Sequence, residues 1–368
     1  MTSEPPATAS RLTVGLDARA ATEVRAGRGR VVRELLRALN ARPEAHQYVC
    51  YARARWQEPL DSRFRWRLIP GPDPLWHVRA ADSASRECDV FLSTNSYLTV
   101  TLTRIPSVAI IHDLIPFDRN ASPRLRSVLI ERLTIGGAVR RAKRLVCTTH
   151  VTADALIGRY PAAATRVTVA PLAVAPMLGA PSAAELADLP EPGYVLAVGT
   201  LEPRKNLPRL VSAYAMLPPE LQADHPLVVV GALGWRTGST LSALRSLGDR
   251  CRLLGHVSDS ALAELYRRCS AFCYPSLGEG FGLPVLEAMA AGAAVVTSNV
   301  SSLPEVGGDA VAYVDPHDAR DIARGLREVL TDPALGERLG ERARARAAGF
   351  SWSRFGGQIL QALQSAAG

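Results

Sequence analysis

The chain has 368 residues, of which 47% are hydrophobic and 21% are charged, and its formal net charge is +8. This composition excludes an intrinsically disordered chain, and the length suits two domains that each build a core. No apolar run reaches the length needed to span a bilayer, and residues 1–10 are polar and proline-rich without an apolar signal segment, so we expect a cytoplasmic protein.

The charge is unevenly distributed. Residues 1–180 contain 26 Lys/Arg and 15 Asp/Glu, a net charge of +11, whereas the remaining residues contain 17 and 20, a net charge of −3. A basic first half indicates an anionic partner for that half. The six cysteines include no Cys-x-x-Cys pair and lie mostly in apolar runs, which favours free thiols over metal ligands or disulfides.

Short runs rich in Val, Ile and Leu alternate with helical patterns along the whole chain. The strands expected in the first half are Leu12–Leu16, Tyr48–Tyr51, Trp66–Ile69, Val90–Leu92, Val108–Ile111, Leu145–Cys147 and Val167–Val169. Those expected in the second half are Tyr194–Val198, Leu227–Val230, Arg252–Leu254, Ala271–Tyr274, Ala294–Thr297 and Val311–Val314. Apolar strands separated by helices are typical of parallel sheets with both faces covered.

A segment rich in Ala, Pro and acidic residues, Gly179–Gly193, is predicted to be the linker between two domains. We therefore expect an α/β fold of two doubly wound, Rossmann-like parallel-sheet domains at residues 1–180 and 181–350. Ligands of such folds bind beyond the carboxyl ends of the strands, so two facing domains would share a central cleft.

Near the N-terminus, Gly27-Arg28-Gly29-Arg30 leads into a predicted helix at Val31–Leu39. Flexible glycines and two guanidinium groups suit a phosphate or an acceptor. A mobile surface loop is the alternative, because a Gly-x-Gly pattern alone is a weak signal.

His112 and Asp113 directly follow the strand Val108–Ile111. At the carboxyl end of a strand in this fold, a histidine can hydrogen-bond a sugar and the neighbouring aspartate can orient it. The usual alternative is a structural or surface histidine.

Residues 119–144 contain eight Arg/Lys and one acid, Glu131, with leucine, isoleucine and valine interleaved. A basic amphipathic helix of this kind suits an anionic membrane face or an anionic acceptor, and a solvated helix face is the alternative. No nucleic-acid reading module is present, so nucleic acid is not an expected partner.

The second domain opens with the strand Tyr194–Val198 and a turn that carries Arg204 and Lys205. A guanidinium fork beside an ammonium group suits a diphosphate leaving group, whereas a solvated turn is the alternative. Further along, backbone groups near Leu254–Val257 are candidates for base recognition, and Ser258 is expected to cap the helix that follows.

The strongest signal lies after the strand Ala271–Tyr274, where a glycine-rich turn opens a helix that ends at Gly292. The start of the helix offers backbone N–H groups to phosphate or hydroxyl oxygens. Glu279 in the turn and Glu287, expected in the first helical turn, can accept hydrogen bonds from a polyol. Together these features predict a nucleotide-sugar pocket.

The segments Gly199–Asn206 and Glu279–Glu287 resemble the retaining glycosyltransferases with the GT-B fold, in the mannosyltransferase-like branch of glycosyl transferases group 1. The resemblance continues at Ala290–Ser298 and Leu303–Glu305 and covers nearly the whole chain. Three positions depart from it. Many relatives carry an arginine where Thr200 stands, and they carry an isoleucine and a tyrosine where Arg28 and Val31 stand.

The resemblance implies a role for each matching residue. The cations neutralise the departing nucleoside diphosphate, Glu279 contacts the sugar hydroxyls, and Glu287 binds the ribose. The implied catalytic residues are His112, Arg204, Lys205 and Glu279. The implied donor-binding residues are Gly27, Gly29, Arg204, Lys205, Val257, Glu279, Gly280, Phe281, Gly282, Leu283 and Glu287. The implied acceptor-binding residues are Arg28, Arg30 and Asp113.

The resemblance also implies that a C-terminal helix, at residues 351–368, packs back on the first domain. The aromatic residues Phe350, Trp352 and Phe355 at its start suit such packing, although periodicity alone does not show which domain it covers.

The expected reaction is transfer of a hexose, with retention, from a nucleoside-diphosphate sugar to a hydroxyl of a glycan, a lipid-linked acceptor or a small glycoside. GDP-mannose is the first choice of donor, with UDP- or dTDP-sugars as alternatives, and polysaccharide biosynthesis is the expected setting. No cofactor and no divalent metal are expected, since the chain has no Asp-x-Asp motif for a metal–diphosphate complex. The location would be cytoplasmic, with peripheral contact to the inner membrane face.

Two kinds of alternative function remain open from the sequence. One is a nucleotide-sugar epimerase or a phosphorylase on the same fold. The other is a non-catalytic subunit that binds a nucleotide sugar as a scaffold.

Overall fold

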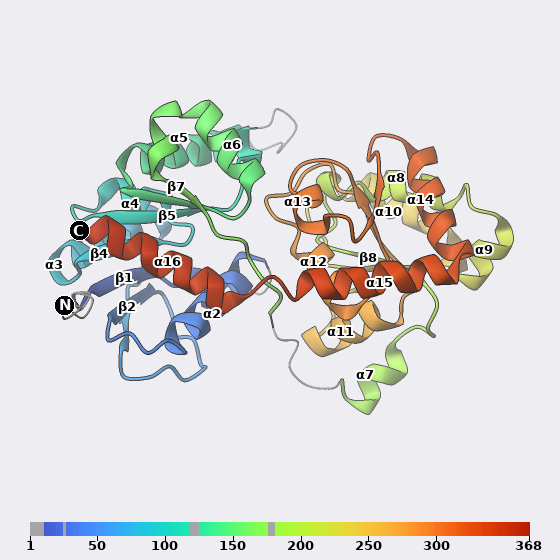
Figure 1. Ribbon diagram of the computed structural model, residues 1–368, viewed down its shortest axis with the longest axis horizontal. Helices are drawn as coiled ribbons and strands as arrows, with labels where there is room; N and C mark the ends of the chain where they lie inside the picture. Colours follow the sequence, from blue (N-terminus) through green and yellow to red (C-terminus); the bar gives the residue numbers. More distant parts are fainter. Residues whose placement is uncertain (1–10, 25–26, 118–124, 176–180) are drawn as a thin grey trace, which may run out of the picture. The chain divides into compact units, whose positions relative to one another are not determined.

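The computed structural model describes residues 11–24, 27–117, 125–175 and 181–368 (Figure 1). The chain divides into two compact units. The first comprises Met1–Thr148, Thr152–Ala170 and Trp352–Gly368, and the second comprises Thr149–Val151 and Pro171–Ser351. The second unit therefore takes up the chain at Pro171, earlier than the predicted boundary at position 181.

The first unit is built on a seven-stranded sheet in the order β3-β2-β1-β4-β5-β6-β7, in which every pair is parallel. Its strands are β1 (Thr13–Asp17), β2 (Gln47–Ala52), β3 (Phe64–Leu68), β4 (Val90–Ser93), β5 (Ser107–Ile111), β6 (Arg144–Cys147) and β7 (Val167–Val169). The helices along this part of the chain are α1 (Arg19–Glu23), α2 (Arg28–Asn40), α3 (Asp73–Glu87), α4 (Tyr97–Leu102), η1 (Ile115–Phe117), α5 (Leu125–Arg141), α6 (His150–Arg159) and η2 (Pro161–Arg166).

The second unit contains a six-stranded parallel sheet in the order β10-β9-β8-β11-β12-β13. Its strands are β8 (Val195–Val198), β9 (Leu227–Val230), β10 (Cys251–Gly255), β11 (Ala271–Tyr274), β12 (Val295–Ser298) and β13 (Ala312–Val314). Its helices are α7 (Ala183–Asp188), η3 (Pro203–Lys205), α8 (Leu207–Tyr214), α9 (Pro219–Asp224), α10 (Gly238–Arg245), η4 (Gly248–Arg250), α11 (Asp259–Arg268), α12 (Leu283–Ala291), α13 (Leu303–Gly307), α14 (Ala319–Thr331) and α15 (Pro333–Ala347).

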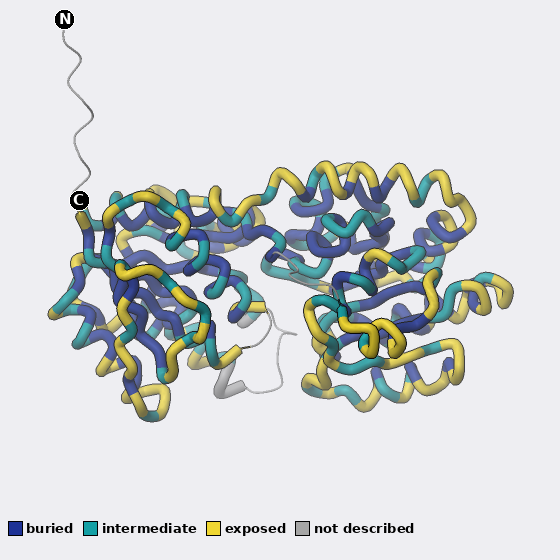
Figure 2. The backbone as a smooth tube through the Cα atoms, turned by 90° about the horizontal axis from the view of Figure 1, so that it is seen from below, coloured by how far each residue is buried: buried dark blue, intermediate teal, exposed yellow. Residues whose placement is uncertain are grey.

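The predicted doubly wound α/β architecture is confirmed, and each predicted strand has a counterpart among the described residues. The reason lies in burial, because a parallel sheet with helices on both faces exposes neither face to water. Every residue of β4, β5, β9, β11 and β12 is buried (Figure 2).

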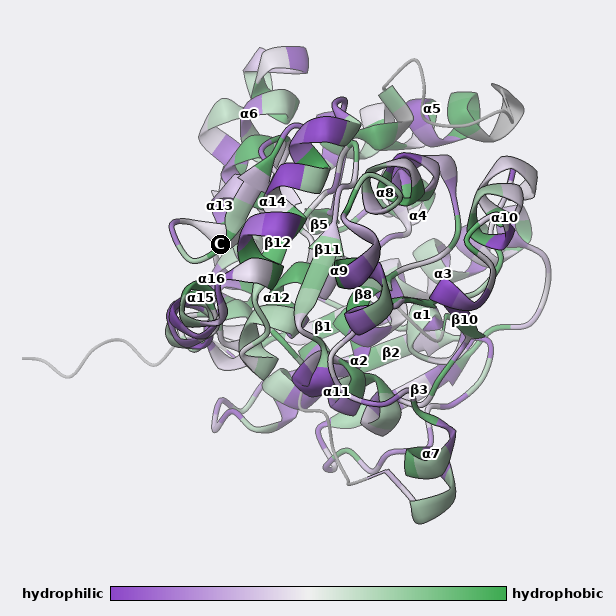
Figure 3. Ribbon diagram, turned by 90° about the vertical axis from the view of Figure 1, so that its right-hand side faces the viewer, coloured by the Kyte–Doolittle hydropathy of each residue, from purple (hydrophilic) through white to green (hydrophobic). Residues whose placement is uncertain are grey.

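The covering helices are amphipathic, as a helix on a sheet must be. In α14, the residues Ile322, Leu326 and Val329 are buried at helical spacing, and hydrophilic bands lie between hydrophobic ones along this helix (Figure 3). Helix α12 differs, since Val285, Leu286, Ala288 and Met289 are all buried within three turns. Glu287 is buried there as well, so α12 lies in the interior of the unit, where it packs on α11, α15 and β12.

The last helix, α16 (Trp352–Ala367), belongs to the first unit. It packs on α2 and lies against β4, β5 and β6 (Figure 1). Phe355 is completely buried there, and the Gln358 side-chain amide donates to the Val169 carbonyl at 2.9 Å. The chain thus returns to its first unit after completing the second.

The predicted linker is not wholly irregular. Within Gly179–Gly193, of which residues 179–180 lie outside the described residues, the chain forms α7. Ser182 accepts from the Glu185 backbone, and the Glu185 side chain accepts from the Ser182 backbone, which forms a capping box. The linker was predicted from its Ala and Pro content, and that prediction overlooked the capping box.

All six cysteines are unpaired, as predicted, and four of them are buried. Among the described residues, no helix is long and apolar enough to cross a membrane.

Candidate active site

The sheet of the second unit reverses its winding direction between β8 and β11. From β8 the chain winds outward through β9 and β10, and from β11 it winds the other way through β12 and β13. Neighbouring loops diverge at such a point and leave a crevice at the carboxyl ends of the strands, where ligands of these folds bind. The two loops concerned are Gly199–Asn206 and Pro275–Gly282.

These two loops are hydrogen-bonded to each other. The Arg204 carbonyl accepts from the Leu277 backbone at 2.9 Å and from Ser276 Oγ at 3.1 Å. Asn206 is buried in the left-handed conformation, with φ of 61°, and its side-chain amide donates to the carbonyl of Pro275 at 2.9 Å. Asparagine tolerates this backbone conformation better than most residues, so Asn206 both forms the turn and joins the loops.

Glu279 lies at the centre of the polar groups that the loops bring together. Its Oε1 accepts from Lys205 Nζ at 2.7 Å, from the Tyr274 hydroxyl at 2.9 Å and from Ser276 Oγ at 2.6 Å. Its Oε2 forms an ion pair with Arg204 Nη1. The side chain is only 9% exposed, so both oxygens are used within the protein.

Burial by itself would raise the pKa of Glu279, but the charges of Lys205 and Arg204 outweigh it and lower the pKa to about 2. Burial lowers the pKa of Lys205, and the Glu279 charge opposes that shift. Burial, together with the Glu279 charge, raises the pKa of Tyr274. At neutral pH the site therefore holds an ionised carboxylate and a neutral phenol hydroxyl that donates to it.

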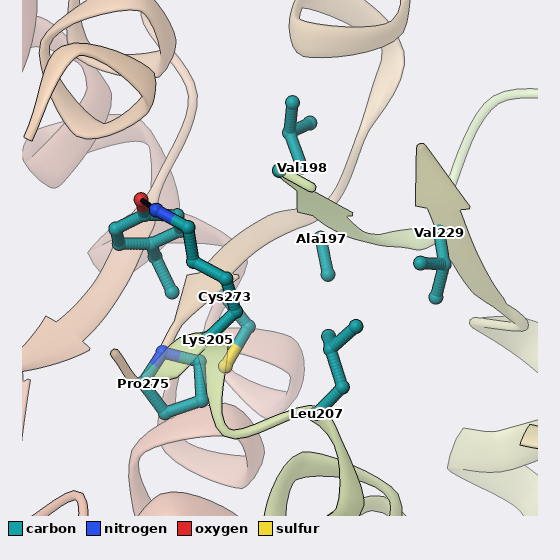
Figure 4. A pocket seen from close by; sticks show the side chains of 9 residues that line it. Ala197, Val198, Lys205, Leu207, Val229, Cys273 and Pro275 are labelled. Atoms are coloured by element: carbon teal, nitrogen blue, oxygen red, sulfur yellow. Dashed lines mark hydrogen bonds between the residues drawn. The ribbon is translucent and has the colours of Figure 1, made fainter. Parts of the chain in front are cut away.

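Lys205 lines a small apolar cavity of about 10 Å³. Ala197, Leu207, Val229 and Cys273 are among the other residues that line it (Figure 4). The ammonium group also lies 4.9 Å from the centre of the Tyr274 ring. The apolar side chains and the Tyr274 ring keep water away from the amine, and this burial explains the lowered pKa of Lys205.

Helix α12 begins directly after the Glu279 loop. Gly282 precedes it with φ of 108°, and a Cβ there would lie 2.8 Å from a Leu303 methyl group. Pro284 has no N–H, and the Val285 N–H donates to the Gly282 carbonyl at 3.0 Å, so the Leu283 N–H is the first-turn group of α12 that can face an anion or a hydroxyl oxygen. Gly280, Phe281 and Leu283 complete the predicted set on this segment.

Glu287 lies in the second turn of α12 rather than the first, because the helix begins at Leu283. Its side chain is 5% exposed, and its Oε2 accepts from the Tyr266 hydroxyl at 3.1 Å. The sequence prediction placed this carboxylate in the first helical turn, which is one turn too early.

Val257, the candidate for base recognition, follows β10 and lines an open cavity of about 500 Å³ beside Leu254 and His256. The predicted role of Ser258 is confirmed, because its Oγ accepts from the Ala261 backbone at the start of α11 at 3.1 Å.

In the first unit, His112 follows β5 and points its Nε2 at the Thr94 carbonyl, 2.8 Å away. A carbonyl only accepts, so Nε2 carries the proton of the neutral ring. Burial lowers the pKa of His112, so the neutral ring is favoured. Asp113 accepts from the Ile115 backbone at 3.0 Å and so shapes the turn into η1.

The predicted glycine loop lies at the start of α2, and residues 25–26 before it lie outside the described residues. A Cβ on Gly29 would lie 1.7 Å from the Val24 carbonyl, so close packing of α1 on α2 requires this glycine. Arg28 Nη1 donates to Asn95 Oδ1 at 2.9 Å, and its charge also acts on His112. Arg28, His112 and Asp113 therefore belong to one neighbourhood, with Gly27 and Arg30 on either side of the turn.

Part of the basic stretch 119–144 forms α5, while residues 119–124 lie outside the described residues. One face of α5 packs on α4 and η1 through buried Ile135 and Val139. Leu129, Ile130 and Leu133 are 57%, 62% and 63% exposed.

Two family models match the chain. Residues 183–346 match the glycosyl transferases group 1 model, and residues 26–177 match the glycosyltransferase family 4 model. The second half of the chain therefore carries a glycosyl transferases group 1 domain, and the first half carries a glycosyltransferase family 4 domain. This confirms the resemblance that the motifs indicated.

Within this family, the chain is 43% identical over 175 residues to the O-antigen chain mannosyltransferase B of Escherichia coli. That match covers 47% of the chain and 46% of the relative, so the chain matches about half the length of this curated protein. The similarity places the chain near mannosyltransferases.

Solved structures confirm the predicted GT-B fold. The sucrose-phosphate synthase of Thermosynechococcus elongatus aligns with a TM-score of 0.76 at 22% identity, over 95% of this chain and 98% of that one. Anabaena HepE, in complex with UDP and glucose, aligns with a TM-score of 0.74 at 18% identity, over 96% of this chain and 100% of its own.

Three polar residues that contact Glu279 or Arg204 through their side chains were absent from the predicted set. They are Glu202, which pairs with Arg204, and Tyr274 and Ser276, which donate to Glu279. Glu202 shares its turn with both cations, a signal visible in the sequence. Tyr274 ends a buried strand, and only the structure shows its hydroxyl turned toward the loop.

Proposed function

We propose that the chain is a retaining hexosyltransferase that uses a nucleoside-diphosphate sugar. The observation that carries this proposal is the meeting of Lys205, Arg204 and Glu279 at the reversal point between β8 and β11, next to the start of α12. Fixed cations and helix-start amides are the groups that stabilise a departing diphosphate.

In the proposed reaction, the bond between the sugar C1 and the diphosphate oxygen breaks while the acceptor oxygen forms a new bond to C1. The negative charge that develops on the diphosphate is stabilised by Lys205, Arg204 and the Leu283 N–H at the start of α12. The acceptor proton passes to the leaving phosphate oxygen on the same face of the sugar, which gives retention without a paired nucleophile and acid. These fixed charges serve the step without a divalent metal.

Glu279 has two tasks in this proposal. A carboxylate accepts about four hydrogen bonds, and Glu279 already receives Lys205, Arg204, Tyr274 and Ser276. Its first task is therefore to orient the two cations. Its second is to accept from sugar hydroxyls that replace Tyr274 or Ser276 when the donor binds.

The proposed donor is GDP-mannose, supported by the similarity to the E. coli mannosyltransferase. UDP-sugars are the alternative, because the structurally similar HepE holds UDP and glucose. The proposed acceptor is a hydroxyl of a glycan, a lipid-linked acceptor or a small glycoside, which Arg28, Arg30 and Asp113 would contact. His112 would hydrogen-bond the transferred sugar.

A direct test is to incubate the protein with GDP-mannose, UDP-glucose and dTDP-glucose and to measure release of nucleoside diphosphate. We expect slow release from one donor, faster release with an acceptor glycan, and no loss of rate in EDTA. Proton NMR of the product should show the retained anomer. An isomerised donor without release, a requirement for inorganic phosphate, or no release from any donor would each contradict the proposal.

We also propose that the exposed face of α5, formed by Leu129, Ile130 and Leu133, rests on an anionic lipid surface. Apolar side chains in contact with water favour insertion at a bilayer interface, and the basic residues of 119–144 are attracted to anionic headgroups.

Co-sedimentation with phosphatidylglycerol vesicles tests this second proposal. The doubly substituted Leu129→Ser/Leu133→Ser protein should lose most of its binding. Leu233→Ser, at an equally exposed leucine of the second unit, should bind like the unaltered protein. Equal binding to neutral phosphatidylcholine vesicles, or no effect of the α5 substitutions, would contradict it.

A further inference from the structure

The guanidinium group of Arg204 is shared between two carboxylates. Its Nη2 donates to Glu202, while its Nη1 pairs with Glu279 and donates to the Gly278 carbonyl at 2.7 Å. Both ends of the guanidinium are thus engaged inside the protein. A diphosphate that takes the position on Nη2 now held by Glu202 must displace that carboxylate.

The two carboxylates are held very differently. Glu279 receives hydrogen bonds or ion pairs from Lys205, Tyr274, Ser276 and Arg204. Among the described residues, the contacts of the Glu202 carboxylate are all with Arg204. The Glu202 side chain is also 19% exposed, compared with 9% for Glu279. Displacing Glu202 costs one partner and returns the carboxylate to water, so it is the easier of the two to displace.

The charges of the cluster explain why displacement matters. Arg204 and Lys205 supply two positive charges, and Glu202 and Glu279 supply two negative ones, so the cluster as it stands is balanced. A balanced cluster attracts a polyanion weakly, because attraction by the cations is offset by repulsion from the carboxylates. Removal of one carboxylate from the cluster leaves the remaining side chains with a net positive charge, which attracts the diphosphate.

We propose that Glu202 is a built-in competitor of the diphosphate for Arg204. The arriving diphosphate replaces the Glu202 carboxylate on Arg204, and the return of Glu202 after transfer helps expel the nucleoside diphosphate. This inference rests on the proposed function and deepens it, because it assigns the release of product to a specific residue. Glu202 acts through Arg204 and is a positioning residue that tunes affinity.

Isothermal titration calorimetry with GDP and UDP, combined with stopped-flow dissociation, tests the proposal. Glu202→Gln keeps the size of the side chain and removes its charge. We expect it to bind the preferred nucleoside diphosphate about tenfold more tightly, mainly through slower dissociation. Glu328→Gln is the matched control, since Glu328 also pairs with an arginine, Arg324, but on α14. It should bind like the unaltered protein.

A second pair of variants separates competition from a general charge effect. In an Arg204→Ala background, Glu202→Gln should give little of the tenfold gain, because the residue for which the two anions compete is gone. A structural role for Glu202 predicts the opposite sign, namely weaker binding in Glu202→Gln.

The outcomes distinguish this inference from the proposed function. Unaltered or weaker binding in Glu202→Gln, or an equal gain in the Arg204→Ala background, overturns the competition and leaves the glycosyltransferase proposal standing. If the unaltered protein binds no nucleoside diphosphate at all, the proposed function fails, and the competition fails with it.

Discussion

The two units share one arrangement of strands but carry different polar groups at the point where the winding reverses. In each, the winding direction reverses between the first and fourth strands, β1 and β4 in the first unit and β8 and β11 in the second. At the end of β1, buried Asp17 accepts from Ser96 Oγ and from the Arg19 backbone, and the Arg19 guanidinium lies 4.0 Å above the Trp76 ring. Asp17 and Arg19 also form an ion pair, and their side chains are only 3% and 13% exposed.

At the corresponding place in the second unit, the cations lie on loops and one of their counter-ions, Glu202, is loosely held. The comparison shows that the winding of the sheet decides where polar loop ends gather. The residues on those loops decide whether the charges stabilise the fold or remain available to a ligand.

The largest expected effect is on turnover. Lys205→Ala and Glu279→Ala should each lower the rate of donor turnover by about 10²–10³-fold, because each change removes or misorients a charge at the departing diphosphate. Circular dichroism should show that both variants stay folded. Near-normal turnover in either variant would show that the cluster of Arg204, Lys205 and Glu279 takes no part in the reaction.

Asp17→Ala should act mainly on stability. It leaves Arg19 and Ser96 without their buried acceptor, and we expect a loss of about 3 kcal/mol in the free energy of unfolding. Urea unfolding measures this loss. Asp154→Ala, at an exposed aspartate on α6, should change stability by less than about 0.5 kcal/mol. If Asp17→Ala were as mild as this control, the contrast between the two units would be wrong.

A smaller effect concerns pH. The lowered pKa of Lys205 means that its ammonium group loses its proton below the usual value of 10.5, so affinity for a nucleoside diphosphate should fall as the pH rises. We expect a several-fold fall between about pH 7 and pH 10, measured by calorimetry. Lys205→Arg should abolish this dependence, since arginine stays charged. An identical pH profile in Lys205→Arg would assign the titration to another group.

A fall in pH below neutrality should have a different effect, because it acts on Glu279. Because the pKa of Glu279 is depressed to about 2 from 4.5, its ion pairs stabilise the fold fully above pH 4.5 and lose that contribution as the pH falls toward 2. Binding should therefore change little between pH 5 and pH 7 on account of Glu279.

The strands were readable from the sequence because a buried parallel strand is a short apolar run, which is a local signal. Lys205 and Glu279 were chosen because they lie on the loops that follow two such runs, and their roles stay predictions. Features that depend on a distant partner were not readable. The left-handed Asn206 joins two loops some seventy positions apart in the chain, and the Tyr274 hydroxyl depends on the position of Lys205. Helix α7 was not predicted for a different reason, because the linker was inferred from amino-acid composition and its capping box was not considered.

The most direct test of the account is a crystal structure of the protein with a bound nucleoside diphosphate. The account predicts that the pyrophosphate oxygens lie about 3 Å from Lys205 Nζ and from the Leu283 backbone nitrogen at the start of α12, with Arg204 turned from Glu202 toward the phosphate. A pyrophosphate bound away from both Lys205 and the start of α12 would contradict it.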